Sequence, residues 1–153
     1  MAHNPVNHPL RPIYRAIGGI VGLYFVVFGI LGIIIAADEG LFGRAGDRVL
    51  FQGTNLFWSI VALLIGAIVL VATVLGNNRD VLVDTYLGWT LVVIGTFSLA
   101  VIRTDANFLD FSISTVIVNY LTGLALILAG YYTKVAPPEQ AGAPRQVREE
   151  RTA

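Results

Sequence analysis

The sequence contains no cysteine and little charge. Without cysteine, disulfide frameworks, thiolate metal sites and cysteine nucleophiles are excluded. Only 13% of the 153 residues are charged, against about 25% in an average soluble domain. Ten acidic residues balance ten basic ones. Because nucleic-acid binding relies on an excess of Lys and Arg, a nucleic acid is not an expected partner.

Histidine is also scarce, with His3 and His8 alone near the N-terminus. A closed zinc site normally needs four ligands, so two histidines do not predict one. The sequence shows no Gly-rich phosphate loop, no nucleophile–base–acid pattern and no histidine pair within its apolar runs that could ligate haem. We therefore expect no catalytic residues, no cofactor and no metal, and we expect that the protein is not an enzyme.

Long runs without charge dominate what is present, at residues 16–37, 49–78, 85–102 and 111–133. About 20 helical residues cross a hydrocarbon core of about 30 Å. A soluble protein with buried helices is the alternative, but too few polar residues remain to cover its surface. The sequence predicts an all-α membrane protein with a four-helix transmembrane bundle. This domain spans residues 14–134, with helices near 14–36, 55–76, 83–102 and 114–134.

The distribution of Lys and Arg predicts the orientation of the bundle. One side carries Arg11, Arg15, Arg79, Lys134, Arg145, Arg148 and Arg151, and the other carries Arg44, Arg48 and Arg103. The positive-inside rule then predicts that both termini lie in the cytoplasm. The expected location is the cell (inner) membrane, which the protein would cross several times. The N-terminal arm 1–13 and the C-terminal tail 135–153 are rich in Pro and polar residues, so we expect both to be flexible.

A Gly-Val-Val-Gly frame occurs twice, in GLYFVVFG (22–29) and GWTLVVIG (88–95). A second pair of segments, NLFWSIVALLIG (55–66) and NYLTGLALILAG (119–130), follows in the same order. The offsets are 66 and 64 residues. Chance similarity between apolar helices is the alternative, but two ordered matches favour a duplicated helix hairpin. Two spans per unit predict parallel copies, related by an axis along the membrane normal.

Small residues recur at helical spacing along the four predicted helices. In lipid, small side chains let helix backbones approach closely. We expect this role for Gly18, Gly22, Gly29, Ala62, Gly66, Gly88, Gly95, Ala125 and Ala129. The alternative is a seam on the bundle surface that receives another subunit.

Asn55, Asp84 and Asn119 are the candidate polar contacts, because polar groups within a bilayer are costly. Asp84 is interpreted as an interfacial carboxylate or a helix N-terminal charge, since no buried cationic partner is visible in the spans. A proton-titrating group is the alternative. Asn55 and Asn119 are interpreted as caps or interhelical hydrogen-bonding groups, with a ligand site as the alternative. The loop 37–54 could lie on the membrane surface or contact a partner.

The segments VVFGILG (26–32), NLFWSIVALLIG and NYLTGLALILAG resemble a family of small four-span membrane proteins of high-GC Gram-positive bacteria. This family is classed as a domain of unknown function, and the resemblance covers about residues 14–134. Helix 2 of the family often carries a His three residues after the Asn. Trp58 and Thr122 occupy the two corresponding positions here, so no role of such a His transfers to this chain.

These observations favour a non-catalytic accessory or stabilising subunit of a larger integral membrane complex, with respiratory complexes among the candidates. Its expected partners are membrane lipids and that complex. A small transporter or channel acting as a homo-oligomer is the main alternative. An enzyme acting on lipids is a weaker one, because only Asp84 or the outer-loop carboxylates could begin its active site.

Overall fold

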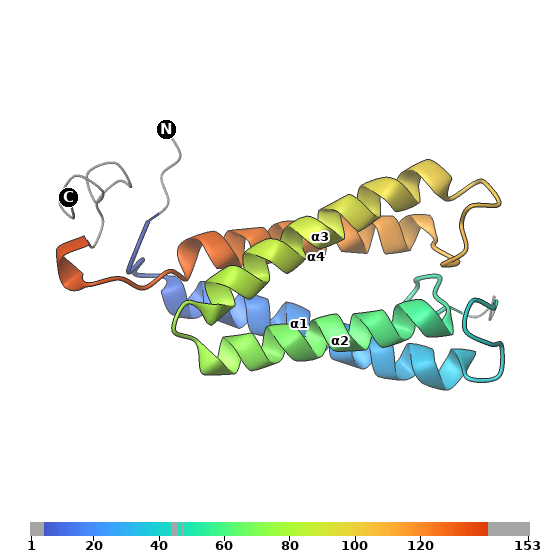
Figure 1. The fold of residues 1–153 in the computed structure, drawn as a ribbon, viewed down its shortest axis with the longest axis horizontal. Coiled ribbons are helices and arrows are strands. Elements are labelled where there is room, and N and C mark those ends of the chain that lie inside the picture. The colour runs from blue at the N-terminus through green and yellow to red at the C-terminus, as the bar shows by residue number, and fades with distance from the viewer. Residues whose placement is uncertain (1–4, 44–45, 47, 141–153) are drawn as a thin grey trace.

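The structure is a computed structural model that describes residues 5–43, 46 and 48–140. It contains four long helices, α1 (Arg11–Ala36), α2 (Leu56–Leu75), α3 (Arg79–Val101) and α4 (Ile113–Tyr132), and a short 3₁₀ helix η1 (Pro138–Gln140) (Figure 1). The described residues form no strand, only an isolated bridge between Val49 and Gln52. All four helices are long and apolar enough to cross a membrane. The predicted all-α architecture, with four apolar helices of membrane-spanning length, is therefore confirmed.

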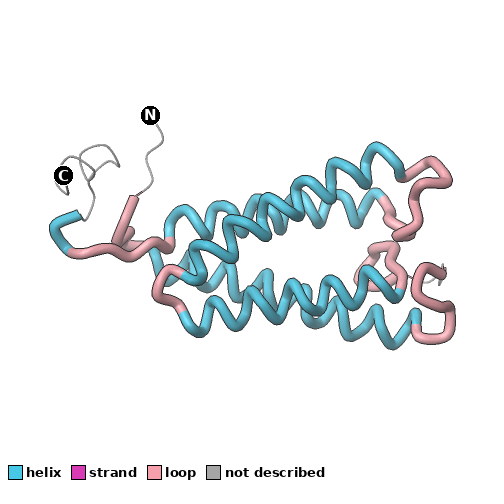
Figure 2. The backbone as a smooth tube through the Cα atoms, viewed as in Figure 1, coloured by secondary structure: helices cyan, strands magenta, loops and turns pink. Residues whose placement is uncertain are grey.

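The helices form two hairpins that lie side by side. α1 packs along α2 and α3 packs along α4, while α1–α4 and α2–α3 contacts join the hairpins more sparsely. The start of α1, the end of α4 and the α2–α3 turn lie at one end, here called the terminal end (Figure 1). The two long connections lie at the opposite end, here called the loop end (Figure 2). The two ends carry different polar clusters.

Local signals define where each helix begins and ends. Asn55 caps α2 by accepting a 2.9 Å hydrogen bond from the backbone N–H of Trp58. Ser112 and Thr115 form a capping box at the start of α4. Asn77 and Asn78 adopt positive φ angles of 52° and 66° in the α2–α3 turn, a conformation that Asn tolerates better than most residues. This tight turn lets α3 begin at Arg79, earlier than the predicted start near residue 83.

The interior is filled by apolar side chains from all four helices. Phe25, Phe28, Leu91 and Leu126 are at most 2% exposed. Trp58 packs edge-on against Phe111, with ring centroids 4.9 Å apart. Many large apolar side chains lie on the outside of the bundle, as expected where lipid rather than water surrounds a helix surface.

Glycine pairs bring the two helices of each hairpin into backbone contact. A Cβ atom built on Gly66 would lie 2.6 Å from the carbonyl oxygen of Gly22, and one on Gly22 would lie 3.2 Å from that of Gly66. Gly88 and Gly123 are related in the same way, at 2.7 and 2.8 Å. The distances of 2.6–2.8 Å at Gly66, Gly88 and Gly123 are too short for a Cβ atom, and Gly22 is crowded at 3.2 Å, so glycine lets the helices of each hairpin approach at these crossings.

The other predicted packing residues also lie at helix contacts. A Cβ atom on Gly29 would lie 2.6 Å from the backbone nitrogen of Leu63, and one on Gly95 would lie 3.5 Å from the Cβ of Asn119. Ala62 and Ala129 are fully buried, and Ala125 is half-buried against the core. Gly18 faces Asp84.

The predicted pairing of Asn55 with Asn119 differs from the positions in the structure. Asn55 precedes α2 as its cap, whereas Asn119 lies well inside α4. Ser112 holds the capping position of α4 instead. The glycine crossings align the hairpins with an offset of 66 residues for α1 and α3 and of 57 residues for α2 and α4. The sequence similarity at an offset of 64 therefore joins positions that differ by two helical turns.

The segments that flank the helices are held at the terminal end. Within the predicted arm 1–13, α1 begins at Arg11 and Val6 is only 1% exposed. Asn7 donates its backbone N–H to the carbonyl oxygen of Lys134 at 2.9 Å. Some residues used in the sequence predictions lie outside the described residues: His3, Arg44, Arg145, Arg148 and Arg151.

Candidate functional site

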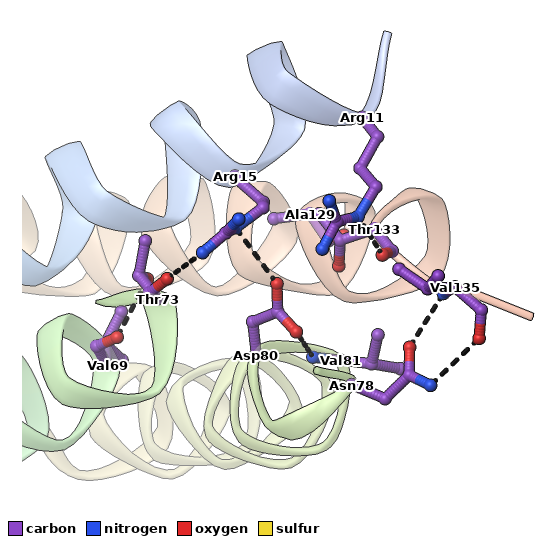
Figure 3. A network of polar contacts seen from close by, with 10 residues as sticks. All are labelled: Arg11, Arg15, Val69, Thr73, Asn78, Asp80, Val81, Ala129, Thr133 and Val135. Atoms are coloured by element: carbon purple, nitrogen blue, oxygen red, sulfur yellow. Dashed lines mark hydrogen bonds and ion pairs between the residues drawn. The ribbon is translucent and has the colours of Figure 1, made fainter. Parts of the chain in front are cut away.

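Two arginines on the first turns of α1 bind the C-terminal ends of two other helices. Arg11 donates from Nε to the carbonyl oxygen of Thr133, the C-cap of α4, at 2.9 Å. Arg15 donates from Nη2 to the carbonyl oxygen of Thr73 in the last turn of α2 (Figure 3). The last carbonyls of a helix lack intrahelical donors and carry the negative end of the helix dipole. A guanidinium group supplies both hydrogen-bond donors for these carbonyls and a positive charge at the negative end of the dipole.

Arg15 also forms an ion pair with α3. Its Nε atom lies 3.3 Å from Oδ2 of Asp80 (Figure 3). The Asp80 side chain is 1% exposed and that of Arg15 is 29% exposed. Asp80 lies in the first turn of α3, where the positive end of the helix dipole stabilises an anion. Arg15 therefore connects α1, α2 and α3 with one side chain.

Asp84 lies one turn further along α3 and is also 1% exposed. Among the described residues, neither of its carboxylate oxygens has a hydrogen-bond partner. The side chain points at α1, because a Cβ atom on Gly18 would lie 2.8 Å from Oδ2. Asp84 was interpreted as an interfacial carboxylate or a helix N-terminal charge; it lies between α3 and α1, near the N-terminal end of α3. The early start of α3 places Asp84 in the second turn, beyond the exposed helix end.

Asparagine side chains tie the chain after α4 to the rest of the terminal end. Asn78 donates to the carbonyl oxygen of Val135 at 2.9 Å and accepts from its N–H at 2.7 Å (Figure 3). Asn7 forms the same two-bond arrangement with Ala136, at 2.7 and 3.1 Å. The terminal end is thereby closed by a network that reaches all four helices.

The loop end contains a second polar cluster made largely of the connection between α1 and α2. Gln52, Thr54 and Asn55 are at most 3% exposed. Gln52 donates to the hydroxyl of Tyr24 within α1, and Asn55 donates to the carbonyl oxygen of Phe108 at 2.8 Å. This part of the loop 37–54 thus enters the bundle, in contrast to the surface location considered for the whole loop.

The two connections also bind each other. Gly53 donates its N–H to Oγ of Ser112 and accepts from the hydroxyl of Thr115, both at 3.0 Å. Beside them lies an open polar hollow of about 690 Å³, whose lining includes Arg48, Arg103 and Asp105. Charges of both signs line it, so it favours neither anions nor cations.

Asn119 has an incomplete hydrogen-bonding environment. It is 1% exposed, and its Nδ2 atom has no partner within the described part of the chain. The three predicted polar residues are therefore not brought together. Asn55 belongs to the loop end, Asp84 to the terminal end and Asn119 to the interior of α4. In the described ranges, no three His, Cys, Asp or Glu side chains gather to hold a metal ion.

Arg15 and Asp80 were not predicted as members of a site. Arg15 was assigned to membrane orientation, and Asp80 was placed before the predicted third helix. The available signal was spacing, because Arg11 and Arg15 are four residues apart and so are Asp80 and Asp84. Residues at i and i+4 share one helix face.

Four apolar helices, closed at one end by an arginine–aspartate network and at the other by an inserted loop, define a compact multi-pass membrane protein. The chain belongs to the family described as Domain of unknown function (DUF4383), whose model matches residues 15–132. That range includes Arg15, Asp80 and Asp84. No curated protein matches the chain, and no solved structure matches it.

Proposed function

We propose that the protein is a non-catalytic accessory subunit that binds a larger integral membrane complex of the bacterial inner membrane through the outer face of α3. Respiratory complexes are candidates for this partner. The observation that carries the proposal is the exposed aromatic face of α3. Of the four helices, α3 has the smallest buried share.

A lipid-facing helix is expected to be more apolar where it is more exposed. The exposed residues of α3 include an aromatic set that shares one helix face. We call this set the α3 stripe: Tyr86, Trp89, Thr90, Val93 and Phe97. Tyr86 is 68% exposed and Trp89 is 50% exposed. Tyr and Trp are enriched at protein interfaces, where they contribute much of the binding energy.

The hydroxyl groups near the α3 stripe are oriented by local bonds. Thr90 donates to the carbonyl oxygen of Tyr86 at 2.9 Å. Thr96 donates to the carbonyl oxygen of Val92 and also lies 2.9 Å from the hydroxyl of Tyr120. Transmembrane helices associate by close packing and interhelical hydrogen bonds. A partner helix is thus offered aromatic surface together with two acceptor hydroxyls.

Photo-crosslinking in native membranes tests this proposal. Benzoylphenylalanine at Trp89 or Val93 is expected to capture a distinct larger membrane protein, identified by mass spectrometry. The matched control is Ile20 on α1, which is 67% exposed and is expected to capture lipid alone. Purification as a monodisperse monomer, with no protein captured from the α3 stripe, would refute the proposal. Capture of a second copy of this chain would instead support a homo-oligomer.

A small transporter or channel is the second candidate, and Asp84 is the observation that favours it. A buried carboxylate without a partner resembles the ionisable groups that mark ion pathways in membrane proteins. Against it stand the glycine crossings and the buried Phe25, Leu91 and Leu126, which fill the space between the helices. Flux of protons or metal ions into vesicles, abolished by Asp84→Asn, would favour this candidate over the accessory subunit.

We further propose that both termini face the cytoplasm and that the two hairpins descend from one ancestral pair. The glycine crossings support duplication, as do the equal lengths of α2 and α4. Because the chain lacks cysteine, single introduced thiols can test the orientation. A membrane-impermeant thiol reagent is expected to label Phe51→Cys at the loop end in intact cells. Asn77→Cys at the terminal end should require permeabilised cells, and the reverse pattern would contradict the orientation.

A further inference from the structure

The charges buried at the terminal end do not balance. Arg15 and Asp80 form one ion pair, which leaves the equally buried Asp84 without a counterion among the described residues. An isolated carboxylate loses its hydration on burial and gains nothing in return. A buried site with this composition needs one more positive charge near Asp84, or a neutral Asp84.

The helices packed around Asp84 do not supply that charge. α2 and α4 contain no charged residue. On α1, Arg11 binds the carbonyl oxygen of Thr133 and Arg15 binds that of Thr73 as well as Asp80. On α3, Asp80 adds a like charge one turn away, and Arg79 is exposed. The tyrosines at this end, Tyr14 and Tyr132, stack on each other with centroids 4.8 Å apart.

A metal ion fits this position poorly. Na⁺ and K⁺ are held by several oxygen ligands, yet Asp84 and Asp80 are the only carboxylates of α3. The space beside Asp84 is also narrow, because a Cβ atom on Gly18 would meet Oδ2 at 2.8 Å and the carboxyl carbon at 3.5 Å. A proton needs neither the space nor the extra ligands.

We propose that Asp84 is a proton-binding site, occupied in the folded protein so that its side chain is a neutral carboxylic acid packed against Gly18. The proton comes from water, adds to one carboxylate oxygen, and changes no other bond. Its release would leave two carboxylates one turn apart competing for the single guanidinium of Arg15. The proton on Asp84 therefore determines whether Arg15 forms an ion pair with Asp80 alone. This inference is independent of the partner proposed for the α3 stripe.

Infrared spectroscopy of the full chain in lipid nanodiscs at neutral pH tests the proposal. The wild type is expected to show the C=O stretching band of a protonated carboxylic acid, shifted on exchange into heavy water. Asp84→Asn should lose this band. The matched control is Asp105→Asn, the same change at an exposed loop residue, and it should keep the band.

A second measurement keeps the proposal testable if Asp84→Asn does not fold. Wild-type protein labelled with ¹³C at the Asp carboxyl carbons should show one resonance of a neutral acid by solid-state NMR. Wild-type protein without the infrared band and without this resonance would overturn the proposal. So would a band that persists in folded Asp84→Asn. A rise in unfolding temperature with Na⁺ or K⁺ over choline, lost in Asp84→Asn, would assign the site to a metal ion and also overturn it.

Discussion

Gly22 and Gly66 face each other where α1 crosses α2, and the carbonyl oxygen of each lies where the other would carry a side chain. The same reciprocal contact joins Gly88 and Gly123 in the second hairpin. No hydrophobic driving force acts between helices in lipid, so such contacts stabilise a hairpin through dispersion and close approach. The stabilisation that these contacts provide depends on the absence of a side chain at both glycine positions.

Replacement of Gly66 by Ala is expected to destabilise the first hairpin. The new methyl group would lie 2.6 Å from the backbone nitrogen of Val26 as well as from the Gly22 carbonyl, and backbone cannot move aside cheaply. Overpacking of this kind costs about 1–3 kcal/mol. The free energy of unfolding, measured by titration of the purified protein with denaturing detergent, reports the change.

Gly19 provides the matched control for this substitution, because it lies on the same hairpin. A Cβ atom there would meet Cγ2 of Thr73 at 3.6 Å, an ordinary van der Waals distance. Gly19→Ala is therefore expected to change the free energy of unfolding by less than about 0.5 kcal/mol. Equal destabilisation by the two substitutions would show that the crossing at Gly66 is not special.

The sequence predicted the four spans because their signal is local. Each helix lies largely within a run of uncharged residues, and glycine spacing identified most of the helix contacts. Gly123 was not predicted, because the alignment at an offset of 64 residues matched Gly66 with Gly130 instead. Gly130 instead packs against Thr85 of α3. Repeated apolar residues define a helix well but define its register poorly.

The terminal end was harder to predict because its contacts join residues far apart in the chain. Arg15 and Asp80 belong to different hairpins, and a charge next to an apolar run is equally consistent with a headgroup contact. The position of Asp84 depended on where α3 begins. Asn77 and Asn78 at positive φ allow that early start, and a turn of this kind is not apparent from hydropathy alone.

The ion pair of Arg15 with Asp80 is expected to contribute measurably to stability. Arg15→Met leaves the buried Asp80 carboxylate without its positively charged partner, although the N–H of Val81 still donates to it, and also removes the bond to the Thr73 carbonyl. Since Arg15 is partly exposed, we expect a loss of about 1–3 kcal/mol in the free energy of unfolding. Arg15→Lys should recover part of it, because Lys keeps the charge but lacks the fork that reaches both partners.

A double-mutant cycle separates the ion pair from the bond to Thr73. The effects of Arg15→Met and Asp80→Asn should sum to more than the effect of the double substitution, because each single change breaks the same ion pair. Additive effects of the two substitutions would contradict an energetic coupling between Arg15 and Asp80.

The side chain of Asn78 is expected to hold the segment that follows α4. Asn77 and Asn78 both have positive φ angles, so Gly preserves the backbone at either position. Asn78→Gly removes the two bonds to Val135, and the Val135 amide should then exchange with heavy water more than about fivefold faster, for a loss of about 1 kcal/mol. Asn77→Gly, where no side-chain bond is lost, should leave exchange unchanged. Similar exchange in both variants would argue against this role of Asn78.

Asn55 and Asn119 look alike in sequence but should respond in opposite ways to replacement by Leu. Asn55 caps α2 and donates to the carbonyl oxygen of Phe108. Asn55→Leu removes the buried cap and also the donor to the Phe108 carbonyl, at a cost of about 1–3 kcal/mol. Asn119 buries an amide donor that no described residue accepts. Because an apolar side chain of similar size removes that unsatisfied group, Asn119→Leu should leave the free energy of unfolding unchanged or raise it. Both variants are compared in the same detergent titration. Strong destabilisation by Asn119→Leu would indicate that the Asn119 amide has a partner in the membrane.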